Sequence, residues 1–239
     1  MPELPDAFCN SHRDRQNYFG HHARMSGLAT IVGSRTRVMI RQTKEWGEIL
    51  LGFESNNRFK LSDDQGHELG LAAEESKGVG AFFARNLLGK CRKASIHIYG
   101  TDGSRLGRGE KPFRWFFHRM EVFDGDKKIG AIQRKWSWLH RKFAIENEAG
   151  QEVMEIFSPM FRIWTFKLMF EGQECGRISK KWGGLLKEMF TDADMFGMEC
   201  EEHVPVELRS ILMVATFLID FTCFENNSRS GIGLNLMGD

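Results

Sequence analysis

The chain has 239 residues, which is enough for one domain with a substantial hydrophobic core. Its 33 lysines and arginines nearly balance its 32 aspartates and glutamates, so net charge gives no reason to expect nucleic acid binding or a general attraction to anionic surfaces. The five cysteines are widely spaced, with no CxxC pair and no zinc-like spacing, which favours a reducing compartment.

Residues 1–27 are polar and irregular, and they predict a flexible N-terminal arm. The first 25 residues carry charge throughout and contain no apolar run of the kind that forms a secretory signal. We therefore expect a protein that is not secreted and stays in the cytoplasm, either peripheral or single-pass at the cytoplasmic face of a membrane.

Residues 28–225 predict a single domain, which is mainly β up to about residue 202. Short runs rich in Val, Ile, Phe and Trp alternate with explicit turns, and this pattern is typical of antiparallel hairpins. The turns are SDDQG (62–66), GTDG (100–103), FDGD (123–126), NEAG (147–150) and FEGQ (170–173).

An internal repeat runs through this β region with a period of 47 residues. SIHIYGTDG (95–103) aligns with KFAIENEAG (142–150) and then with MFTDADMFG (189–197), and with a slip of one residue AIQRKW (131–136) aligns with RISKKW (177–182). Such a period predicts a unit of about four strands, repeated around a closed sheet.

Three basic and aromatic segments are candidates for lipid contact: FRWFFHR (113–119), RKWSWLHRK (134–142) and KKW (180–182). Trp beside Lys or Arg suits the headgroup region of a membrane. The candidate residues are Arg114, Trp115, Arg119, Arg134, Lys135, Trp138, Arg141, Lys142, Lys180 and Lys181. The alternative is ordinary strand alternation, in which Trp136 and Trp138 point into the core while Lys135 and Ser137 face water.

FTDADMFG (190–197) has two interpretations. As a calcium loop, Asp192 and Asp194 occupy positions 1 and 3 and a glycine occupies position 6, but Phe196 and His203 stand where oxygen ligands are needed. Nearby carboxylates could substitute, namely Glu199, Glu201 and Glu202. This interpretation predicts at best a weak calcium site, and calcium is the only cofactor we expect. The repeat favours the other interpretation, a hairpin turn.

The segment ELRSILMVATFLIDFTCFE (207–225) has no turn residues and is apolar on all sides from Ile211 to Ile219, which predicts a helix over about 206–224. Its expected core or membrane-facing residues are Ile211, Leu212, Val214, Phe217, Leu218, Ile219 and Phe221. The uncharged run from Ser210 to Ile219 has about half the length that a membrane span requires, which favours a protein core. Residues 226–239 predict a C-terminal tail.

No catalytic pattern accompanies these elements. The eight histidines are scattered, and no nucleophile elbow or P-loop is present. We therefore expect no catalytic residues and no bond chemistry, although lipid translocation would need neither.

Several segments occur in an order that closely resembles the phospholipid scramblase family: WGEILLGFESNNRFKL (46–61), LAAEES (71–76), GRISKKWGG (176–184), FTDADMFG and FLIDFTCFE (217–225). The resemblance implies a tubby-like fold, also similar to plant LURP-one-related proteins: a closed antiparallel β-barrel of about twelve strands around the hydrophobic C-terminal helix. It also implies calcium-linked phospholipid movement, with the Asp192 region as the cation segment and the 206–224 helix as a membrane anchor.

The chain departs from the family pattern at two places. It lacks the cysteine-rich tracts that support palmitoylation, and it lacks the proline-rich N-terminal arm of many members. The expected function is therefore phospholipid movement or anionic-lipid binding at a membrane surface, with no nucleic acid partner. The alternative is a soluble barrel that binds phosphoinositides or other anionic lipids peripherally, or acts as a scaffold, without scrambling.

Overall fold

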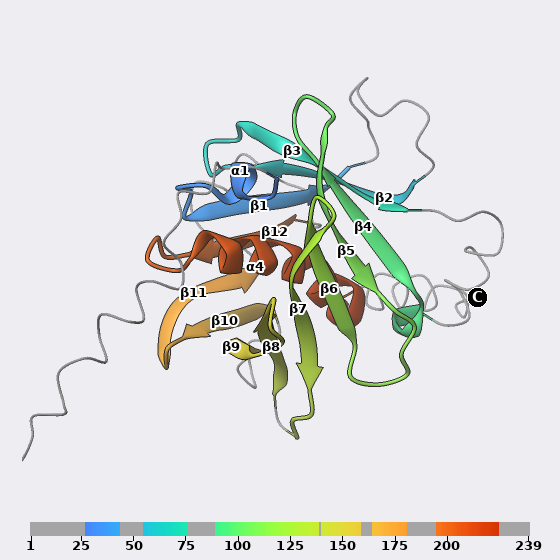
Figure 1. Ribbon diagram of the computed structural model, residues 1–239, viewed down its shortest axis with the longest axis vertical. Helices are drawn as coiled ribbons and strands as arrows, with labels where there is room; N and C mark the ends of the chain where they lie inside the picture. The colour runs from blue at the N-terminus through green and yellow to red at the C-terminus, as the bar shows by residue number, and fades with distance from the viewer. Residues whose placement is uncertain are drawn as a thin grey trace, which may run out of the picture.

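The computed structural model describes residues 27–43, 55–75, 89–138, 140–158, 164–180 and 195–224 (Figure 1). Twelve strands dominate them. The strands are β1 (Arg37–Gln42), β2 (Ser55–Ser62), β3 (Glu68–Glu75), β4 (Ala94–Tyr99), β5 (Arg105–Lys111), β6 (Arg119–Asp124), β7 (Lys127–Lys135), β8 (Arg141–Asn147), β9 (Glu152–Ser158), β10 (Thr165–Phe170), β11 (Gln173–Ser179) and β12 (Met195–Cys200).

Every strand pairs antiparallel with its neighbours in the chain, and β1 closes the sheet by pairing with β12. The predicted closed antiparallel barrel of about twelve strands is confirmed. Because consecutive strands run in opposite directions, their connections alternate between two ends of the barrel. One end, called here the short-turn end, carries the turns after β2, β4, β6, β8 and β10. The other, the long-loop end, carries the connections after β1, β3, β5, β7, β9 and β11.

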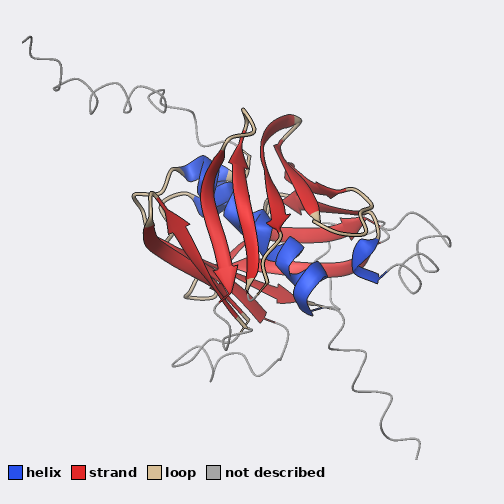
Figure 2. Ribbon diagram, turned by 90° about the horizontal axis from the view of Figure 1, so that it is seen from below, coloured by secondary structure: helices blue, strands red, loops and turns tan. Residues whose placement is uncertain are grey.

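A helix fills the barrel, as predicted. The 14-residue α4 (Val206–Ile219) begins at the short-turn end and continues as the π-helical segment η4 (Asp220–Phe224) toward the long-loop end (Figure 2). Every α4 residue from Leu208 to Ile219 is buried, and Phe217 packs edge-on against Phe59 of β2 at 5.1 Å. Among the described residues, no helix is long and apolar enough to cross a membrane.

The internal repeat corresponds to a four-strand unit, β4–β7 followed by β8–β11. In the first hairpin of each unit, Ile96 pairs with Gly109 and Phe143 pairs with Ile156, 47 residues further along. In the second hairpin of each unit, the equivalent pairs lie 46 residues apart in the sequence, which agrees with the predicted slip of one residue. The third copy is wrong, because Gly197 pairs with Met39 and Ser179 inside β12 instead of ending a turn. The proposed turn at Asp192 and Asp194 lies outside the described residues.

A β-bulge interrupts each of the five hairpins close to its turn at the short-turn end. In every hairpin the register skips one residue of the second strand, and the skipped residues are Leu69, Leu106, Ile129, Val153 and Cys175. All five are hydrophobic and belong to the core or pack against it. A bulge re-aims its extra side chain, so the five hairpins direct this ring of hydrophobic side chains onto the core at the short-turn end.

Candidate membrane-contact site

The long-loop end exposes a group of large aromatic side chains, called here the aromatic tip. Its members lie in the β5–β6 connection and just after β7, and their exposed fractions run from 43% to 84%. They are Phe113, Trp115, Phe116, Phe117, Trp136 and Trp138. Phe113 packs edge-on against Trp115 with ring centres 5.2 Å apart, and Trp136 packs against Trp138 at 6.4 Å. Exposed aromatic surface of this kind marks an interaction site on a folded protein.

Hydrogen bonds hold the two connections of the tip together. The Arg134 backbone N–H donates to the His118 carbonyl at 2.8 Å, and the Gln133 side-chain amide donates to the Phe117 carbonyl at 2.8 Å. Phe117 adopts a positive φ of 52°, which is costly for a bulky residue and needs such support. The tip is thus held outward by the fold.

His118 lies buried directly beneath the tip. Burial lowers the pKa of its imidazole to about 4, and the neighbouring cations Lys111, Arg134 and Lys90 act in the same direction. The side chain is therefore neutral at pH 7, and its Nδ1 has no hydrogen-bond partner among the described residues.

Positive charge surrounds the aromatic tip. The segments 89–93, 112–119 and 134–142 contain no aspartate or glutamate. Lys90, Lys93 and Arg114 are exposed and Arg134 is half-buried, and within the described residues none of these four makes an ion pair. Aromatic side chains flanked by unpaired cations suit the interface of an anionic membrane.

The structure separates the predicted lipid-contact residues by position. Trp115 is 63% exposed and Trp138 is 84% exposed, and both belong to the tip, while Arg114 and Arg134 are among the cations that flank it. The alternative in which Trp136 and Trp138 pack inward is wrong. Strand alternation ends with β7 at Lys135, so both side chains lie beyond the strand and are not directed by its pleat.

Three other predicted cations are engaged on the barrel wall. Lys135 pairs with Glu152, Lys142 pairs with Glu155 at 2.6 Å, and Arg119 holds both carboxylate oxygens of Glu146 at 2.9 and 2.6 Å. The hydrogen bond from Arg119 lowers the pKa of the Glu146 carboxyl, against the opposing effect of burial. These contacts give the three residues a structural role in the sheet.

The remaining candidates are placed differently. The Lys180 ammonium lies over the rings of Trp164, Phe196 and Phe224 at 5.0 to 5.9 Å, where it covers the end of the helix. Arg141 is half-buried at the start of β8, and Lys181 lies outside the described residues.

The candidate calcium ligands are only partly described. Asp192 and Asp194 lie outside the described residues. Glu199 faces two guanidinium groups, Arg37 at 2.8 Å and Arg177 at 2.9 Å, which leaves its carboxylate poorly suited to a cation. Burial raises the pKa of Glu199, but these arginines outweigh it and the pKa is lowered.

The other two carboxylates of this group, Glu201 and Glu202, are exposed, and Glu201 contacts His203 at 3.1 Å. Within the described part of the chain, no group of three or more His, Cys, Asp or Glu side chains is arranged to hold a metal.

A buried polar network supports the site and was missed from the sequence. Arg92 contacts Glu74, Asn57 donates to Glu74 at 2.6 Å, and the Lys111 ammonium donates to the Arg92 carbonyl at 2.6 Å. Arg92 also lies 5.5 Å from the ring centre of Phe221 in η4. The network links segment 89–93 to the helix end. Its members come from distant strands, so no local pattern could have indicated it.

The candidates chosen from the sequence also omitted four tip residues, Phe113, Phe116, Phe117 and Trp136. The signal was present: four of five consecutive residues in FRWFF are aromatic, and the run directly follows Pro112, a residue that disfavours a continuing strand.

The structure defines a class of protein in which a closed antiparallel barrel surrounds one hydrophobic helix and exposes an aromatic and cationic end. Comparison with known families places the chain in it: the family model described as Scramblase matches residues 21–226, and the chain belongs to this family. No solved structure matches the chain.

Individual relatives carry the same name. The chain is 30% identical over 205 residues to human phospholipid scramblase 1, covering 80% of this chain and 63% of that protein. It is 29% identical over 204 residues to phospholipid scramblase 2 of Bos taurus, covering 79% and 68%, and 26% identical over 205 residues to human phospholipid scramblase family member 5, covering 80% and 74%. The match thus spans about two thirds of the first two relatives.

Proposed function

We propose that this protein binds the anionic surface of a membrane peripherally, through the aromatic tip and its surrounding cations. The observation that carries the proposal is the combination of six exposed aromatic side chains with four cations, Lys90, Lys93, Arg114 and Arg134, in described segments that contain no aspartate or glutamate. Each Lys or Arg near an anionic leaflet contributes about 1 kcal/mol, so Lys90, Lys93, Arg114 and Arg134 together would support reversible binding.

Peripheral contact also agrees with the position of α4. Moving this helix into a bilayer would open a barrel whose inner wall is lined by side chains such as Ile96, Phe143 and Phe166, all fully buried. Exposing each of these large apolar side chains to water costs about 1.5–3 kcal/mol. The helix therefore serves the protein better as a core than as an anchor.

A second candidate function is movement of phospholipid between leaflets. Membership of the scramblase family and the names of the relatives favour it. We propose the cytoplasmic face as the place of contact for either function, which the four free cysteines among the described residues support. A calcium dependence remains a proposal that centres on Asp192 and Asp194.

Flotation of the full-length protein with vesicles tests the proposal. We expect binding to phosphatidylserine-containing vesicles and little binding to phosphatidylcholine alone, without a need for detergent. Trp115→Ala/Trp136→Ala/Trp138→Ala should reduce binding about tenfold or more, because each tryptophan carries a large interfacial area. Unchanged binding of this variant would refute the role of the tip.

The same protein and vesicles also test the second candidate function, movement of phospholipid between leaflets. Parallel flotation with and without calcium, together with a leaflet-exchange assay on labelled vesicles, asks whether bound protein also moves lipid. Calcium-stimulated exchange that Asp192→Asn abolishes would establish the scrambling function. Binding without exchange would leave peripheral contact as the activity.

A further inference from the structure

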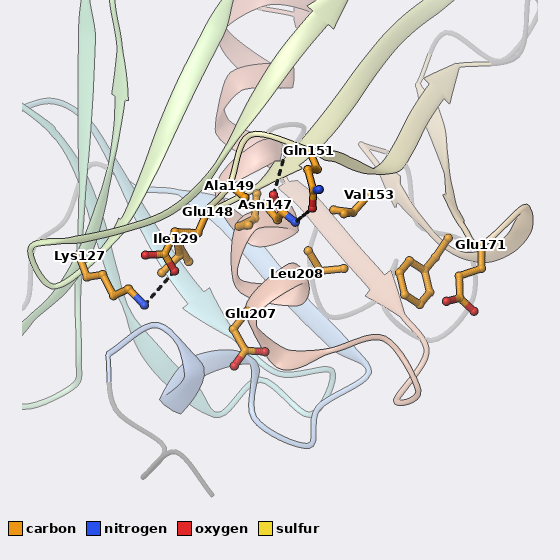
Figure 3. Close-up of a pocket in the computed structure, with 12 residues that line it drawn as sticks. Lys127, Ile129, Asn147, Glu148, Ala149, Gln151, Val153, Glu171, Glu207 and Leu208 are labelled. Atoms are coloured by element: carbon orange, nitrogen blue, oxygen red, sulfur yellow. Dashed lines mark hydrogen bonds and ion pairs between the residues drawn. The ribbon is translucent and has the colours of Figure 1, made fainter. Parts of the chain in front are cut away.

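The short-turn end of the barrel is only partly covered. The short helix α1 (Ala29–Val32) lies over one sector, where Leu28 and Ile31 are fully buried against the glycines that follow the bulges of β3 and β5. In another sector, beside β7, β9 and the first turns of α4, a cavity of about 540 Å³ remains (Figure 3). This volume is in the range of small-molecule sites, about 300–1,000 Å³.

The floor of the cavity is apolar. It consists of Ile129, Val153, Phe170, Leu208 and Ile211. Two of these, Ile129 and Val153, are bulge residues, so the irregularity of the strands directs them to this end. Leu208 and Ile211 come from successive turns of α4 and are buried. The floor is therefore built from fixed elements of the fold.

The rim of the cavity is acidic. Glu148, Glu171 and Glu207 line it together with one cation, Lys127, whose ammonium pairs with Glu148 at 2.9 Å (Figure 3). Glu171 and Glu207 make no ion pair with any described residue, and both are exposed. The negative charge extends to Asp124, whose pKa is raised by burial, with a further contribution from Glu207.

We propose that this pocket binds an organic ammonium ion that carries an apolar chain, with the chain on the apolar floor and the ammonium at the acidic rim that Glu171 and Glu207 help to form. Carboxylates accept charge-assisted hydrogen bonds from an ammonium group, and the net negative rim repels an anion. The amides at the start of α4 favour an anion, but Glu207 in the first turn already offsets them. A free long-chain amine and an amine-bearing lipid share this chemistry.

Calorimetric titration of the full-length protein tests the assignment with octylamine, octan-1-ol and octanoate at pH 7. Octylammonium should bind about tenfold more tightly than octanol, and octanoate should bind most weakly, because the three differ chiefly in the charge of the head group. Equal or tighter binding of octanoate would overturn the proposal. Lysophosphatidylethanolamine below its micellar concentration serves as a fourth probe. Its affinity relative to that of octylammonium distinguishes an amine-bearing lipid from a free long-chain amine.

Matched variants locate the binding. Glu171→Gln/Glu207→Gln should weaken octylammonium binding about tenfold while leaving octanol unchanged. The control Glu155→Gln/Glu174→Gln removes the same charge from the outer barrel wall and should leave both unchanged. An equal loss in the control would overturn the assignment of the site.

A volume-filling variant adds an independent readout. Val153→Trp should abolish binding of octylammonium and octanol alike, and thermal unfolding would verify that it folds. Retained binding in a folded Val153→Trp protein would contradict the proposal. The pocket and the aromatic tip occupy opposite ends of the barrel. A negative result for ammonium binding therefore leaves the proposed vesicle binding untouched, and a negative result for vesicle binding leaves the proposed pocket untouched.

Discussion

Among single residues, the partner of a cation decides its role. Arg119, Lys135 and Lys142 match the pattern for lipid contact as well as Arg114 does, yet each has a glutamate on a nearby strand. Removing Arg119 would leave the Glu146 carboxylate, only 9% exposed, without its hydrogen-bonded partner, and breaking a buried ion pair typically costs about 3–5 kcal/mol. Substitutions at such residues would therefore report on stability before they report on lipid binding.

His118 gives a prediction about pH. Its pKa is about 4 in the folded protein, against 6.5 for an unperturbed histidine, so below pH 6.5 the unfolded chain binds the extra proton. The contribution of His118 to the free energy of unfolding is therefore fully present above pH 6.5 and is lost as the pH drops toward 4. We expect this residue to cost about 2 kcal/mol of unfolding free energy between pH 7 and pH 5.

Urea unfolding of the wild type and of His118→Leu at pH 7, 6 and 5 measures this effect. Leucine fills a similar volume and removes a buried nitrogen that has no partner among the described residues, so the variant should be at least as stable at pH 7. An identical loss of stability in both proteins would show that other groups titrate.

At the level of elements, the bulges show a repeat that the 47-residue period did not reveal. The skipped residue follows a charged one and precedes glycine in four of the five hairpins, in ELGL, RLGR, KIGA and ECGR, while EVME has methionine. The glycine has a steric reason: a Cβ on Gly130 would lie 2.3 Å from the Glu146 carbonyl oxygen of the neighbouring strand. A short motif could thus have predicted how the barrel end closes.

The core helix gives a prediction about stability. Leu218 is fully buried, so Leu218→Ala should lower the free energy of unfolding by about 2–5 kcal/mol, and Leu218→Asp should prevent folding. Val206→Ala, at a half-buried position of the same helix, is the matched control and should cost much less. Chemical denaturation without detergent provides the measurement. A well-folded Leu218→Asp barrel would mean that the helix is not part of the core.

For the whole molecule, the distribution of charge matters more than its sum. The chain has a net charge of +1, yet the described long-loop end is cationic while the pocket at the short-turn end has an acidic rim. A dipolar arrangement of this kind orients a protein toward an anionic surface even when its net charge is small.

This asymmetry predicts salt-sensitive, end-specific binding. Raising the salt from about 0.05 M to 0.5 M should weaken binding to anionic vesicles about tenfold or more, because exposed charges are screened. Arg114→Glu/Arg134→Glu should have a similar effect at low salt. The same change at the other end, Arg105→Glu/Lys127→Glu, should have little effect. Equal losses in both variants would point to non-specific attraction.

The sequence by itself determined the family, the strand content, the four-strand repeat and the core helix. The family follows from the order of the segments that resemble it. The strands and the helix follow from local alternation, from turn residues and from a ten-residue apolar run that is too short for a bilayer but suits the interior of a barrel. The strand, turn and helix signals lie within a few residues of one another, and the repeat needs only a comparison of the sequence with itself, so all of them can be read without knowing the fold.

Only the tertiary structure decided which cations are free, which tryptophans are exposed and where a cavity remains. Glu146 reaches Arg119 from 27 residues away, and the cavity combines Ile129 of β7 with Ile211 of α4. Contacts of this kind depend on strand register and on where a strand ends. A shift of one residue reverses the direction of every side chain, and the periodicity of a sequence does not fix that shift.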